Sequence, residues 1–194
     1  MDKRQRILNW AINSLLIILL AGFGFIGVYN LRQNNLEMLR LREAVFTADR
    51  DNGDTGEALS KLQIFVVSHM NTTLPKLGDQ KAIQLKYTYD RKVAAEDARV
   101  AAARTALNSE ATEYCQKAYP TSSFTVRSQC VQDYFTAHPI NKAEIPVELF
   151  SYDFVTPLWT PDTAGLSLLA AAVLAVVLIL KLLSRLIVRR STTA

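Results

Sequence analysis

The densest group of side chains that could do metal chemistry lies between residues 49 and 57. It comprises Asp49, Asp51, Asn52, Asp54 and Glu57, and Ca²⁺ takes oxygen ligands of this kind. The spacing differs from the calcium-loop pattern D-x-[DN]-x-[DN]-G, because a glycine occupies the third ligand position. We therefore interpret the cluster as a polar turn between two helices, with Asp54 capping the second helix, and predict no metal site.

The other candidates for chemistry are isolated residues. His69 and His138 are the two histidines, and neither has a second His or Cys three or four residues away, as zinc sites usually require. The tripeptide at residues 71–73 fits the N-x-[ST] glycosylation pattern, which arises often by chance. The chain contains no G-x-S-x-G, P-loop or G-x-G-x-x-G motif. We therefore expect no enzyme activity, no catalytic residues and no cofactor.

Two apolar runs bracket the chain, at residues 7–29 and 164–183. Each is close to the roughly 20 residues that a helix needs to cross roughly 30 Å of hydrocarbon. The sequence therefore predicts an all-α membrane protein, with two transmembrane helices on either side of a polar region at residues 30–163.

The net charge of +4 comes from the two ends of the chain, whereas residues 30–163 have a slight acidic excess. Short flanks rich in Lys and Arg stay cytoplasmic, which predicts cytoplasmic ends at residues 1–6 and 184–194 and an extracytoplasmic region between the spans. Basic side chains beside a membrane are explained by lipid headgroups, so we expect no nucleic-acid partner. The predicted basic anchors are Lys3, Arg4, Arg6, Lys181, Arg185, Arg189 and Arg190.

Aromatic residues fall near the ends of both spans. Trp10 and Tyr29 lie near the ends of the first run, and Trp159 precedes the second. Rings of this kind prefer the headgroup level of a bilayer, so we predict that all three are interface anchors.

The first run has an alternative interpretation as a cleavable signal peptide, because a short basic segment precedes it. Its apolar stretch exceeds the usual 7–15 residues of a signal peptide, and no A-x-A-like cleavage site follows. We favour a retained membrane anchor.

The two cysteines, Cys115 and Cys130, both fall in the predicted outside region. An even number of cysteines in an oxidising compartment indicates a disulfide, and the alternative is a pair of buried free thiols. We favour the disulfide.

Helical periodicity dominates residues 30–163. The first helix is predicted to continue from the span to about residue 48, a second helix to end near residue 70, and a long Ala-rich helix to cover about 81–118. A shorter helix is predicted at about 126–137, and a short turn at 147–150. Together these elements predict one helical bundle.

Both spans carry stripes of small residues, which allow helices to approach closely in lipid. The stripes favour packing of the two spans on each other, with association between subunits as the alternative. Asn9 and Asn13 would need polar partners if they are buried. The residues of the stripes are Ala21, Gly24 and Gly27, and Ser167, Ala171 and Ala175.

The chain resembles a group of two-span membrane proteins of Saccharibacteria and related candidate-phylum bacteria, to which no activity is assigned. The resembling stretches are spread over most of the chain, and the likeness implies a location in the bacterial plasma membrane. They are residues 31–54 (LRQNNLEMLRLREAVFTADRDNGD), 65–74 (FVVSHMNTTL), 83–91 (IQLKYTYDR) and 151–165 (SYDFVTPLWTPDTAG).

Our functional hypothesis is an integral membrane protein whose external helices bind or scaffold a protein partner in the cell envelope, or a second copy of the chain. The alternative is a subunit that senses a small ligand and signals through a separate cytoplasmic protein.

Overall fold

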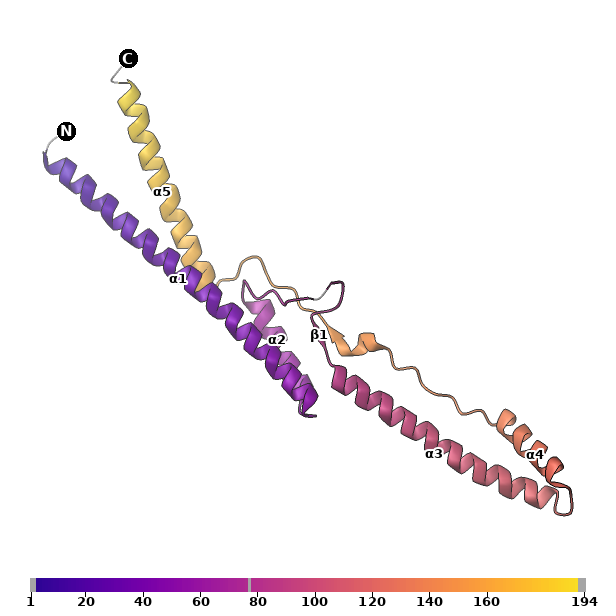
Figure 1. Ribbon diagram of the computed structural model, residues 1–194. Helices are drawn as coiled ribbons and strands as arrows, with labels where there is room; N and C mark the ends of the chain where they lie inside the picture. Colours follow the sequence, from indigo (N-terminus) through magenta and orange to yellow (C-terminus); the bar gives the residue numbers. More distant parts are fainter. Residues whose placement is uncertain (1–2, 77, 192–194) are drawn as a thin grey trace. The chain divides into compact units, whose positions relative to one another are not determined.

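The computed structural model describes residues 3–76 and 78–191, without the side chains of residues 186 and 188–191. The fold is almost entirely helical, as the sequence predicts (Figure 1). Its elements are α1 (Lys3–Arg50), α2 (Thr55–Ser68), β1 (Ile83–Gln84), α3 (Lys86–Ala118), α4 (Phe124–Ala137), the 3₁₀ helix η1 (Val147–Phe150), β2 (Ser151–Tyr152) and α5 (Thr163–Ser191).

The chain divides into two compact units. The first contains Met1–Ile83 together with Asp153–Ala194, and the second contains Gln84–Tyr152. The helices between the two apolar runs are therefore shared between two units, and the single helical bundle expected for residues 30–163 is not confirmed.

Helix α1 runs without interruption through the first apolar run and on to Arg50. It contains no proline, and its three glycines do not break it. The helix ends in a tight turn, in which Asn52 adopts a left-handed conformation with φ of 57° and the Gly53 N–H donates to the Ala48 carbonyl at 2.8 Å. Asparagine tolerates this conformation better than most residues. The polar turn predicted between the first two helices is confirmed and covers residues 51–54.

Helix α2 begins at the predicted cap. The Glu57 N–H donates to Oδ1 of Asp54 at 2.8 Å, which satisfies one of the free N–H groups in the first turn of the helix. The helix packs on α1 and buries Leu62 and Val66, while α1 contributes Met38 and Val45. This apolar seam is one part of the core of the first unit.

Helix α5 lies alongside α1 (Figure 1). Gly27 of α1 faces Leu168 near the beginning of α5, and Asn13 contacts Lys181 further along α5. Because residue numbers rise along one helix as they fall along the other, the pair is antiparallel. Both helices are long and apolar enough to cross a membrane.

A two-stranded sheet, β1 with β2, was not predicted. The Leu85 N–H continues this pairing by donating to the Phe150 carbonyl at 2.8 Å. Residues 83–84 therefore belong to a strand, and α3 begins at Lys86, later than the predicted start near residue 81.

Candidate functional site: the disulfide-linked hairpin

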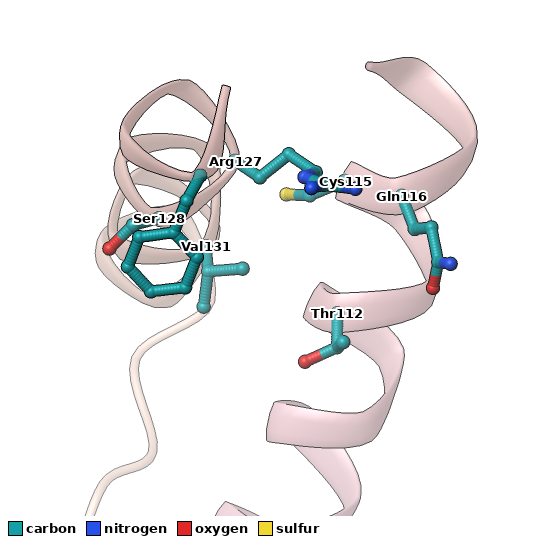
Figure 2. A pocket seen from close by; sticks show the side chains of 7 residues that line it. Thr112, Cys115, Gln116, Arg127, Ser128 and Val131 are labelled. Carbon is teal, nitrogen blue, oxygen red and sulfur yellow. The ribbon is translucent and has the colours of Figure 1, made fainter. Parts of the chain in front are cut away.

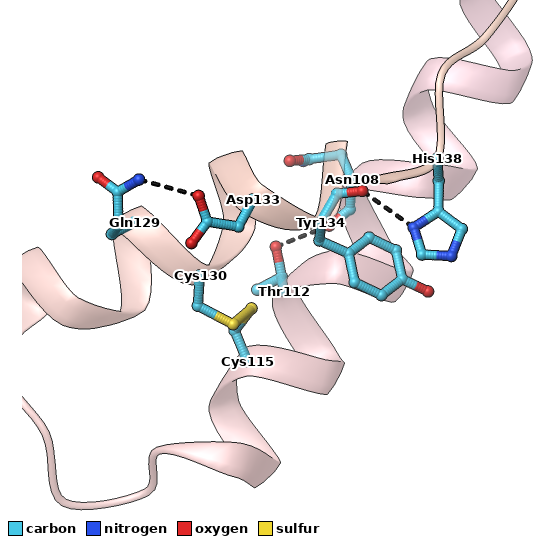
Figure 3. The surroundings of a disulfide bond; sticks show 8 residues. All are labelled: Asn108, Thr112, Cys115, Gln129, Cys130, Asp133, Tyr134 and His138. Carbon is cyan, nitrogen blue, oxygen red and sulfur yellow. Dashed lines mark hydrogen bonds between the residues drawn. A yellow bond between two sulfur atoms is a disulfide. The ribbon is translucent and has the colours of Figure 1, made fainter. Parts of the chain in front are cut away.

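Helices α3 and α4 form a hairpin that is closed by a disulfide (Figure 3). Cys115 lies near the end of α3 and Cys130 in the middle of α4, and their Cα atoms are 5.9 Å apart. The predicted disulfide is present in the structure. Closing a loop of this length contributes about 3 kcal/mol in the loop-entropy model.

Aromatic contacts extend the hairpin beyond the disulfide. The rings of Tyr114 and Tyr134 are 5.4 Å apart across the two helices, and His138 stacks on Tyr134 with centroids 4.2 Å apart. The ring Nδ1 of His138 lies 2.9 Å from the Tyr134 carbonyl oxygen (Figure 3). His138 is therefore held at the end of α4 by its contacts with Tyr134, although the residue is exposed.

The hairpin buries very little of its own surface. All fourteen residues of α4 are described, and none of them is fully buried. In α3 the buried residues are Val100, Ala111 and Cys115. The side chain of Phe124, at the start of α4, is 81% exposed. Other apolar side chains around the turn of the hairpin are exposed as well, namely Tyr114, Tyr119 and Val126.

Two hollows lie between α3 and α4. The first, of about 390 Å³, lies beside the disulfide and mixes apolar with polar side chains (Figure 2). The second, of about 450 Å³, is lined in part by Arg104, Asn108 and His138. The lining of the first is Thr112, Cys115, Gln116, Phe124, Arg127, Ser128 and Val131.

An ionic clamp fastens the segment after α4 to α3. Glu96 accepts two hydrogen bonds from Arg99, at 2.7 and 2.8 Å, and a third from the Ala143 N–H at 2.7 Å. Arg99 also donates to the Asn141 carbonyl at 2.8 Å, and Lys142 pairs with Asp97 at 2.5 Å. The bonds from Arg99 and Ala143 lower the pKa of Glu96 to about 2.

The acidic residues of the first unit do not gather around a common point. Within the part of the chain that the structure describes, no three His, Cys, Asp or Glu side chains lie close enough to hold a metal ion. Asp49 is buried, Asp51 pairs with Arg50, and Glu57 pairs with Lys61. His69 stacks on Phe65 with centroids 4.2 Å apart.

Among the described side chains, the predicted membrane anchors lie on exposed surface except Lys181. Trp10, Tyr29 and Trp159 are exposed, as are the basic anchors Lys3, Arg4, Arg6 and Arg185. Lys181 is partly buried. The side chains of Arg189 and Arg190 lie outside the described residues.

Lys181 provides a polar partner for the first span. Its Nζ donates to Oδ1 of Asn13 at 3.3 Å, beside a hollow of about 170 Å³ that Arg185 also lines. If α1 crosses a membrane, Asn13 would need such a partner, because the hydrocarbon core offers no hydrogen bonds.

The small residues of the two apolar helices differ in burial, and Gly27 lies in the contact between α1 and α5. Gly27, Ser167 and Ala171 are buried, and a Cβ on Gly27 would come within 2.7 Å of Leu168. Gly24 and Ala175 are partly buried, whereas Ala21 is exposed. Of these residues, Gly27 is the one whose close contact across α1 and α5 is resolved, so packing of the two helices through the full stripes stays a prediction.

The start of α5 contains contacts that sequence reasoning missed. Asp162 caps the helix, accepting from the Gly165 N–H at 2.8 Å, and Asn34 of α1 donates to its other oxygen at 3.0 Å. Burial alone would raise the pKa of Asp162, but the bonds from Gly165, Asn34 and Thr160 lower it. An Asp just before an apolar run is a signal for a helix cap and could have revealed this role.

Comparisons with family models, curated proteins and solved structures found no match to this chain.

Proposed function

We propose that this chain is an integral protein of a bacterial plasma membrane, with α1 and α5 as its spans and both ends in the cytoplasm. Residues 30–163 would lie outside, where the α3–α4 hairpin binds a protein partner of the cell envelope. The resemblance to two-span proteins of Saccharibacteria favours the bacterial location.

The low burial of the two apolar helices supports their placement in lipid. Only 6% of the most apolar window of α1 and 11% of that of α5 are buried. The core helix of a water-soluble protein would be mostly buried, because contiguous apolar surface of this extent is rare on soluble monomers. Lipid would cover the exposed side chains.

Retention of the first span is supported by its contacts. Gly27 lies against Leu168, and Asn13 bonds to Lys181. Cleavage at the end of the first apolar run would remove the part of α1 that carries Asn13 and would leave Lys181 without this partner.

The observation that carries partner binding is the exposure of the hairpin's apolar side chains, with Phe124 foremost. A pair of helices usually hides an apolar stripe between them, yet α4 buries none of its side chains fully. The disulfide holds the two helices together without a large core of their own. The exposed rings are then available to a partner.

Site-directed photocrosslinking in intact cells tests this function. A photoreactive amino acid in place of Phe124 should give a defined cross-linked product, to a partner or to a second copy of the chain. The same residue in place of Gln129, which is exposed on the opposite face of α4, is the matched control. Cross-linking that is equal at the two positions, or absent at both, would contradict the proposal.

A second candidate function is sensing of a small ligand, which the hollow beside the disulfide favours. Its volume of about 390 Å³ falls within the usual range of ligand sites, and Gln116, Arg127 and Ser128 supply polar groups. Thermal shifts of the purified protein with a metabolite panel test it. A shift that Arg127→Ala abolishes would support sensing, and no shift with any compound would count against it.

A further inference from the structure

In the segment at residues 155–160, just before α5, polar side chains are more buried than the large apolar ones. Its threonines face the protein, whereas its large apolar side chains face outward. Leu158 is 99% exposed, Val155 83% and Trp159 50%. Thr160, between Trp159 and α5, is buried.

Hydrogen bonds explain why the threonines face inward. Oγ1 of Thr156 lies 2.9 Å from Oγ1 of Thr72 and donates to the His69 carbonyl at 3.2 Å. Oγ1 of Thr160 accepts from the Met70 N–H at 3.2 Å. These bonds tie the segment to the loop after α2 and fix which of its side chains point away.

The same loop is fastened to α1 just beyond the first span. Asn71 donates through Nδ2 to the Leu31 carbonyl at 2.9 Å, two residues after Tyr29. Asn34 bonds to Asp162, at the start of α5. These contacts place the segment beside the end of the apolar part of α1 and the beginning of α5.

We propose that Val155, Leu158 and Trp159 form a wedge that enters the outer leaflet of the bilayer at the boundary of headgroups and acyl chains. This inference rests on the proposed membrane topology and extends it, because it adds a third lipid contact to the two spans. Lipid is the occupant because the segment continues directly into α5. Burying an extended apolar surface at the interface is favourable, and an indole ring prefers this depth.

The fluorescence of Trp159 in reconstituted vesicles tests the wedge. Trp10→Phe leaves Trp159 as the chain's one tryptophan. The vesicles contain phosphatidylcholine, with or without lipids brominated near the start of the acyl chain. We expect blue-shifted emission, strong quenching by the brominated lipid, and quenching by aqueous iodide that is several-fold weaker than for an exposed indole.

The matched control places the indole on the same unit but away from the membrane. Ser60 is exposed on α2, and Ser60→Trp in a background with Trp10→Phe and Trp159→Phe should give red-shifted emission and full iodide quenching. Leu158→Asp, which alters a fully exposed side chain, should move the emission of Trp159 toward that of the control without releasing the protein from the vesicles.

The outcomes separate this inference from the topology on which it rests. Protein that floats with the vesicles but has an iodide-accessible Trp159 overturns the wedge alone. Shielding of Trp159 that increases with the protein-to-lipid ratio points to a second copy of the chain and also overturns the wedge. Protein that does not float with vesicles overturns the topology and the wedge together.

Discussion

Leu168 of α5 lies so close to Gly27 of α1 that a Cβ on this glycine would come within 2.7 Å of the leucine Cδ2 atom. The glycine therefore provides the space in which the two apolar helices meet. In the proposed membrane topology, lipid provides no hydrophobic driving force between the two helices, so such close contact would be a main source of their association.

Gly27→Ala should weaken the pairing of α1 and α5. The added methyl forces the side chain of Leu168 to shift, and overpacking of this kind costs about 1–3 kcal/mol. Thermal unfolding in detergent measures the effect. Gly24→Ala is the matched control, because nothing lies within 4 Å of the Cβ that it adds. Equal stability of the two variants would contradict the close packing.

Gly165→Ala should disturb the first turn of α5 more severely. The new Cβ would lie 1.9 Å from the Thr160 carbonyl oxygen, and a backbone atom cannot move aside as easily as a side chain. We expect a loss of about 2–3 kcal/mol, measured by the same unfolding experiment. Gly22→Ala, which meets nothing within 4 Å, should not lower stability, because alanine is the better helix former.

Removal of the disulfide should loosen the hairpin and leave the first unit intact. A chain with Cys115→Ser and Cys130→Ser loses about 3 kcal/mol of loop-closure stabilisation. Hydrogen exchange should then accelerate in α4 and the end of α3, with no change in α2. Faster exchange throughout both units would show that their stabilities are coupled, contrary to this expectation.

The clamp at Glu96 should make the hairpin sensitive to acid. The pKa of Glu96 is lowered from 4.5 to about 2, so its stabilising contribution is complete above about pH 4.5 and is lost as the pH falls toward 2. Hydrogen exchange at the Ala143 amide measures this loss. In Glu96→Gln the amide should exchange faster at neutral pH and respond less to acid.

Glu113→Gln is the matched control for the clamp. Glu113 also has a lowered pKa, because Lys117 donates to it, but this pair lies within α3 alone. The substitution should therefore leave exchange at Ala143 unchanged. An Ala143 amide that exchanges equally in the wild type and in Glu96→Gln would remove the basis for the clamp.

Local signals were sufficient to predict the helices. The uninterrupted apolar run, the Ala-rich segment and the Asp54 cap each depend on neighbouring residues, and the structure has the corresponding helices. The pairing of β1 with β2 joins residues far apart in sequence, and two-residue strands carry no periodicity. The division into two units was also missed, because it depends on which helices pack together over long distances in the sequence.

The small-residue stripes show how helical geometry limits such a prediction. A spacing of three residues turns about 60° around a helix at each step, and a spacing of four turns about 40°. Along the three-residue stripe of α1, burial therefore falls from Gly27, which is buried, to Gly24, which is partly buried, and Ala21, which is exposed. Starting from the buried Ser167, Ala171 remains buried and Ala175 is partly buried.

The outward wedge could not be predicted in full, since its orientation depends on hydrogen bonds to a distant loop. Trp159 was identified from its residue type and its place before a span. Val155 and Leu158 carried no such signal, because exposed apolar residues are common and residue type alone does not set the direction of a loop side chain. The bond between Thr156 and Thr72 turns Thr156 inward, and the side chains of Val155 and Leu158 then point outward.

Cysteine labelling in intact cells tests the membrane topology most directly. In a background with Cys115→Ser and Cys130→Ser, a single cysteine replaces either Ser60 on α2 or Gln5 at the start of α1, both of which are exposed. With a membrane-impermeant maleimide, Ser60→Cys should be labelled in whole cells and Gln5→Cys only after permeabilisation. Labelling of Gln5→Cys in whole cells, or protection of Ser60→Cys, would contradict the account.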